Sequence, residues 1–60
     1  MTPHMRIVLA VLESANDAGI GDVVAACRRL IMANTIGWRR HHNPRDWETV
    51  KLAWEEINGI

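Results

Sequence analysis

The sequence predicts an all-α fold, a compact three-helix domain with helices over about residues 3–18, 22–35 and 44–57. Apolar residues recur at helical spacing in each of these ranges. Proline follows a capping residue at two of the expected starts, and glycine occurs just after two of the expected ends. The 60 residues, of which 48% are hydrophobic, are expected to form a single small helical domain over 1–60.

The 3–18 helix has the broadest apolar surface. Thr2 is its expected N-cap, Pro3 takes the first helical position, and Gly19 ends it. One apolar stripe contains Met5, Val8, Leu9 and Leu12. A helix with a second stripe must be covered on another side as well, so we expect a homodimer whose interface contains Ile7, Val11 and Ala18. A single core of this size rarely supplies more than ~3–5 kcal/mol, which also favours a second copy.

Residues 5–11 allow an alternative interpretation. Ile7, Val8 and Val11 are β-branched, and such residues favour strands. One strand has no partner within this chain, so it would pair with the same segment of a second copy, as in ribbon-helix-helix repressors. A swapped strand therefore stands beside the helix as an alternative for this segment.

The 22–35 helix begins with Asp22, whose charge suits the positive end of a helix dipole. Its apolar face is expected to contain Val23, Val24, Cys27, Leu30 and Ile31. Cys27 is predicted to be a small buried thiol on that face. Because it is the only cysteine, the chain can form neither an internal disulfide nor a cysteine-based zinc site.

The 44–57 helix has the clearest start, with Asn43 as N-cap, Pro44 at the first position and Asp46 at the third. Its apolar face is expected to contain Trp47, Val50, Trp54 and Ile57, and Asn58-Gly59 should end it. Leu52 on this helix and Met32 on the preceding one are predicted to be exposed apolar residues.

Charge is unevenly distributed along a chain whose net charge is zero. Residues 28–45 contain five arginines and no acid, whereas 1–27 contain one arginine and three acids, and 46–60 one lysine and four acids. The arginine-rich stretch 28–45 also contains histidines and a tryptophan that lie outside any clear helical period. We therefore predict a partner-binding surface containing Arg28, Arg29, Trp38, Arg39, Arg40, His41, His42 and Arg45. The alternative is that Trp38 covers the core while the arginines pair with acids of the 44–57 helix.

Several classes of function are disfavoured. The chain has no phosphate-binding glycine loop, no paired-carboxylate signature and no HExxH metal motif. His41 and His42 are adjacent in an expected loop, where solvated histidines are the usual outcome. We therefore expect no enzymatic activity, no cofactor and no metal. The longest apolar run, Ile7–Leu12, is too short to span a membrane, and the lone thiol suits the cytoplasm.

Binding functions remain. A helix-turn-helix would use the 22–35 helix for recognition, but its first residues are acidic or apolar and cannot read base edges. Tryptophan and arginine are the residues most enriched in protein–protein hot spots. We therefore predict a small protein-binding module, an adaptor or inhibitor of a larger protein, of the kind that phages encode. The alternative is a nucleic-acid-binding regulator that grips phosphates through the arginines of segment 38–45.

One family resemblance concerns about a third of the chain. Gly37-Trp38-Arg39, His42-Asn43-Pro44 and the helix that ends near Glu55-Glu56 resemble the C-terminal part of MbtH-like proteins, accessories of nonribosomal peptide synthetases. The preceding half lacks the strands and the tryptophan–proline pair of that family and favours two helices. No function is carried over from it.

Overall fold

A computed structural model describes residues 3–35 and 43–59, which form the helices α1 (Pro3–Ala18), α2 (Gly21–Thr35) and α4 (Pro44–Ile57). The prediction of an all-α domain with three helices is confirmed, and each boundary lies within one residue of the expected position. Residues 5–11 lie inside α1, so the alternative of a strand there is wrong.

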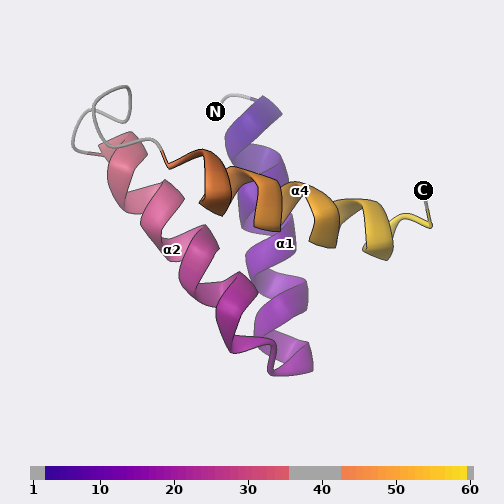
Figure 1. The fold of residues 1–60 in the computed structure, drawn as a ribbon. Helices are drawn as coiled ribbons and strands as arrows, with labels where there is room; N and C mark the ends of the chain where they lie inside the picture. Colours follow the sequence, from indigo (N-terminus) through magenta and orange to yellow (C-terminus); the bar gives the residue numbers. More distant parts are fainter. Residues whose placement is uncertain (1–2, 36–42, 60) are drawn as a thin grey trace.

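The helices form one packed unit in which every pair is in contact (Figure 1). α1 and α2 make a helical hairpin and share the most extensive interface. The first turns of α4 pack on α2. α4 then crosses α1, and the α1–α4 interface is the smallest of the three. The C-terminal end of α4 continues past α1, so the last turns of α1 and α4 diverge from each other.

The turn between α1 and α2 is fixed by a glycine with a positive φ. Gly19 has φ +72°, and its N–H donates to Asn16 O at 3.3 Å. The N–H of Ile20 donates to Ala15 O at 3.0 Å, which completes a Schellman motif. These bonds use carbonyl groups that the helix end leaves without helical partners, and so the chain reverses within two residues.

Gly19→Ala is expected to lower the free energy of unfolding by about 1–2 kcal/mol, because an L-residue is strained in the left-handed region. An added Cβ would meet no atom within 4 Å, so the strain comes from the backbone alone. Gly21→Ala is the matched control: its φ is not positive, the space around it is also open, and alanine favours the helix. Urea unfolding followed by circular dichroism measures the free energy of unfolding of both variants. Equal losses of stability would contradict the assignment of backbone strain to position 19.

The core lies where the three helices meet. Its buried side chains are Val8, Val11, Ala26, Cys27, Leu30 and Val50. Larger residues surround this cluster and are only partly buried, among them Trp47 and Trp54. The burial of Cys27 and the exposure of Leu52 and Met32 are confirmed. Ile57 was expected on the core face but is 53% exposed, because the end of α4 extends past α1.

Candidate partner-binding surfaces

The start of α4 is defined by its cap. Asn43 Oδ1 accepts a hydrogen bond from the N–H of Arg45 at 3.0 Å, and Asn43 O accepts from the N–H groups of Asp46 and Trp47. Pro44 follows the cap, where its missing N–H costs nothing. The predicted start is confirmed. It fixes the directions of the next side chains, including those of Arg45 and Asp46.

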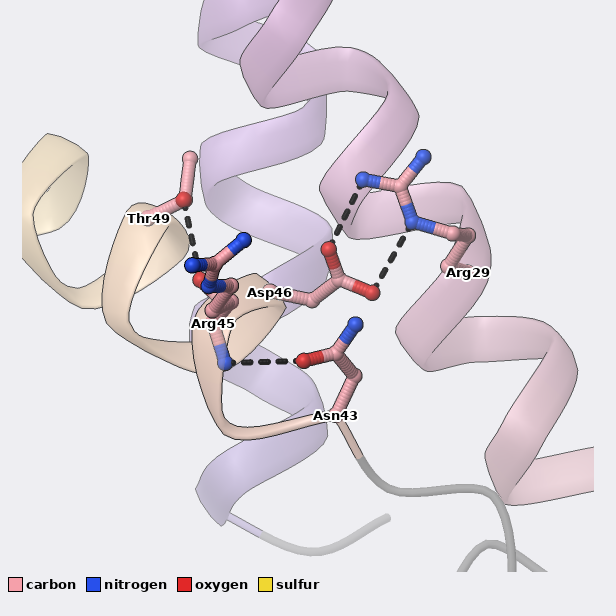
Figure 2. A network of polar contacts seen from close by, with 5 residues as sticks. All are labelled: Arg29, Asn43, Arg45, Asp46 and Thr49. Carbon is pink, nitrogen blue, oxygen red and sulfur yellow. Dashed lines mark hydrogen bonds and ion pairs between the residues drawn. The ribbon is translucent and has the colours of Figure 1, made fainter.

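Asp46 joins α4 to α2 through a two-pronged ion pair with Arg29 (Figure 2). Arg29 Nε donates to Asp46 Oδ2 at 2.9 Å, and Arg29 Nη2 donates to Asp46 Oδ1 at 2.7 Å. The Asp46 side chain is only 7% exposed, whereas that of Arg29 is 59% exposed. The hydrogen bonds to Asp46 raise the pKa of Arg29, and the carboxylate charge adds to this effect.

Arg29 therefore differs from Arg28 and Arg45, the other predicted binding residues that the structure describes. Its guanidinium is already engaged by a buried carboxylate, which is the alternative that the sequence left open for the arginines. The sequence placed Asp46 at the third position of the 44–57 helix and did not specify which arginine it would pair with. Arg29 and Asp46 are 17 positions apart on different helices, a separation at which no sequence spacing predicts contact.

Arg28 and Arg45 are exposed, and the part of the chain that the structure describes shows no ion pair for either side chain. Each is adjacent in sequence to a member of the Arg29–Asp46 pair, which holds their helices together. The other predicted members of this surface, Trp38, Arg39, Arg40, His41 and His42, lie outside the described residues.

A second feature was not predicted: a surface hollow of about 280 Å³ between the last turns of α1 and α4, here called the apolar hollow. Buried or half-buried Val11, Ala15, Val23 and Ala53 line its inner part. Ala18, Ile20, Glu56 and Ile57 line it and are exposed, with Ile20 at 49% and Ile57 at 53%. Ser14 and Glu56 are the only polar residues among those that line it.

The second apolar stripe of α1, predicted as a dimer interface, contains one buried, one half-buried and one exposed residue. Val11 is 0% exposed and belongs to the core, so it offers no surface to a second copy, and that assignment needs correction. Ile7 is half-buried and packs against the core. Ala18 alone of the three is exposed, at the apolar hollow.

Another hollow, of about 310 Å³, lies between α1 and α4 and is lined by Ile7, Trp47, Lys51, Trp54 and Glu55. The ring of His4 stacks on Trp47 with a centroid distance of 3.8 Å and an interplanar angle of 24°. Trp47 and Trp54 pack against the core, as predicted from their spacing, but each keeps part of its surface exposed.

The buried thiol leads to a prediction about pH. Burial raises the pKa of Cys27, because the charged thiolate is disfavoured away from water. The unfolded chain, with an ordinary thiol pKa of about 8.5, then loses this proton first as pH rises, so stability should fall above roughly pH 8. Urea unfolding from about pH 7 to 9 measures the slope. Cys27→Ala is the control, and an unchanged slope in it would contradict the assignment.

The described residues contain no group of three or more His, Cys, Asp or Glu side chains that could hold a metal ion. No helix within residues 3–35 and 43–59 is long and apolar enough to cross a membrane. Comparisons of the chain with protein-family models, with curated proteins and with solved structures find no match.

Proposed function

We propose that the protein is a small non-enzymatic protein-binding module, an adaptor or regulator of a larger protein in the cytoplasm. The observation that carries this proposal is the apolar hollow, at which Ile20 and Ile57 leave about half of their surface exposed. Contiguous exposed apolar surface is costly in water and typically marks a contact with another protein. Nucleic acids present phosphates and sugars on their outer surface, which such a hollow would not stabilise.

In this proposal the exposed arginine side chains would supply a second contact with the partner. Arg28 and Arg45 are exposed, and Arg45 closely follows in sequence the segment that contains Trp38, Arg39, Arg40, His41 and His42. Arginine gives planar, multidentate hydrogen bonding to carboxylates, so an acidic region of the partner is the expected counterpart.

The test is affinity capture from the native host with the tagged chain and two matched variants. Ile57→Ser removes an exposed apolar residue from the rim of the apolar hollow. Leu52→Ser removes one of similar exposure, 57%, from a part of α4 that does not line it. A specific partner should be lost with Ile57→Ser and retained with Leu52→Ser. Equal retention by both variants would contradict binding through the hollow.

The exposure of Arg28 and Arg45 favours one other candidate, a nucleic-acid-binding regulator that contacts phosphates through the arginines. Titration of single-stranded and duplex DNA at several salt concentrations separates the two functions. Affinity that falls steeply with salt and is lost in Arg28→Ala and Arg45→Ala would support the nucleic-acid regulator. Absence of affinity for DNA at low salt would rule out the nucleic-acid-binding regulator.

The homodimer expected from the sequence is a competing proposal for the same surface. Ala18 and the exposed isoleucines of the apolar hollow are the residues that a second copy could cover. Light scattering at high protein concentration measures this directly, since a dimer would have twice the chain mass of 6.8 kDa. A single-chain mass at the highest concentration would remove the homodimer.

A further inference from the structure

The side chains that line the apolar hollow include one carboxylate, that of Glu56, and no lysine, arginine or histidine. The segments that form it lie within residues 7–27 and 52–59, which contain five carboxylates and no lysine, arginine or histidine. These acids are Glu13, Asp17, Asp22, Glu55 and Glu56; Glu56 lines this hollow, whereas Glu55 lines the other hollow together with Lys51. Arg29 is paired with Asp46 at the start of α4, and neither residue lines the hollow.

Three helix ends meet at the hollow, two of them C-terminal, and Asp22 in the first turn of α2 offsets the positive N-terminal end of that helix. α1 ends at Ala18 and α4 ends at Ile57, and both residues line the hollow. The C-terminal end of a helix carries a partial negative charge, which favours cations nearby. Neither helix has a basic residue in its last turn to offset this charge. The hollow thus combines an apolar interior with a negative rim.

Resting on the proposed protein-binding function, we propose that the apolar hollow binds a basic amphipathic helix of another protein. Apolar side chains of that helix enter the hollow, and its lysines or arginines lie against Glu56 and the ends of α1 and α4. An enclosed cavity of about 150 Å³ holds a benzene molecule, so about 280 Å³ admits one or two large side chains. Anchors at helical spacing suit a hollow between two diverging helices.

Charge also argues against a second copy as the occupant. In a two-fold dimer the same patch faces itself, so the hollow would place Glu56 of each copy against the other acidic rim. Like charges brought together at an interface oppose association. A basic helix removes this repulsion and fills the same apolar volume.

The test uses two labelled probe peptides of about 18 residues, five helical turns, with one leucine pattern and either lysine or glutamate at every polar position. Fluorescence anisotropy with the full chain should show the Leu/Lys peptide binding at least about tenfold more tightly than the Leu/Glu peptide at low salt. The difference should shrink as salt screens the rim.

Ala18→Arg is the decisive variant, since it places a cation at the hollow on an exposed position. Arginine is a good helix former and is favourable at a helix C-terminus, so folding should be retained. The variant should bind the Leu/Lys peptide about tenfold more weakly and gain affinity for the Leu/Glu peptide. Ala10→Arg, at an exposed position of α1 away from the hollow, is the matched control and should change neither affinity by more than about twofold.

Two further pairs of variants separate the contribution of charge to peptide binding from the contribution of apolar contact. Glu56→Gln should weaken Leu/Lys binding about two- to fivefold, whereas Glu48→Gln, an exposed acid outside the hollow, should not. Ile57→Ser should weaken it about tenfold relative to Leu52→Ser.

The outcomes distinguish this inference from the function beneath it. Equal binding of both peptides, weakened by Ile57→Ser, overturns the charge preference and leaves the protein-binding function standing. Absence of peptide binding, with a host partner still lost in Ile57→Ser, also overturns the inference alone. Absence of peptide binding together with unchanged capture by Ile57→Ser overturns both. A dimer that Ala18→Arg dissociates identifies a second copy as the occupant and overturns the inference.

Discussion

Leu30→Ala is expected to remove most of the free energy of unfolding at 25 °C. Leu30 is 2% exposed and belongs to the buried cluster at the meeting point of the three helices. Truncation of such a leucine typically costs about 2–5 kcal/mol, as lost transfer free energy plus a cavity. A core of this size supplies only about 3–5 kcal/mol in total, so little stability would remain. Circular dichroism during urea titration measures the fraction folded.

The same substitution at Leu52 is the control. Leu52 is 57% exposed and lies outside the core cluster, so Leu52→Ala should change the free energy of unfolding by less than about 0.5 kcal/mol. If Leu30→Ala remained folded with a similar urea midpoint, stability would have to come from outside this core. A second copy would then be the first alternative to test, and light scattering on the variant would detect it.

The helices could be predicted because their signals are local. Asn43 and Pro44 start α4 through a cap and a fixed φ, and Gly19 ends α1 by adopting a positive φ. Each effect depends on neighbours within about four positions along the chain. The sequence alone was therefore sufficient to place all three helices.

The packing of those helices could not be predicted in the same way. Val11 lies on the α1 stripe expected to face a second copy, yet it is buried in the core of the single chain. Ile57 lies on the expected core face of α4, yet the helix extends past α1 at that point. Helical periodicity defines a face but not the neighbour that covers it or the angle at which that neighbour crosses.

The same distinction applies to the candidate surfaces. The arginines were recognised from composition, but only the fold shows that Arg29 is held by Asp46 while Arg28 and Arg45 are exposed. The apolar hollow arises from the divergence of two helix ends that are far apart in sequence. The sequence shows an excess of acids in residues 1–27 and 46–60. It does not show that the end of α1 and the end of α4 line one hollow.

Arg29→Met should destabilise the protein clearly, whereas Arg28→Met should leave stability nearly unchanged. Loss of Arg29 leaves the carboxylate of Asp46, 7% exposed, without its counterion, and an unpaired buried charge is strongly unfavourable. Arg28 is exposed and has no such partner among residues 3–35 and 43–59. Thermal unfolding by circular dichroism at moderate salt measures both, and the Tm loss for Arg29→Met should be several times that for Arg28→Met.

A double variant shows whether the damage comes from the stranded carboxylate. Arg29→Met combined with Asp46→Leu replaces both charges by apolar groups and should recover most of the stability lost in Arg29→Met alone. Since the pKa of Arg29 is raised, the guanidinium stays charged until pH rises above the ordinary arginine range, and the pair persists at neutral and mildly basic pH. Equal Tm losses for Arg29→Met and Arg28→Met would return Arg29 to the partner-binding surface, because its charge would then be dispensable for the fold.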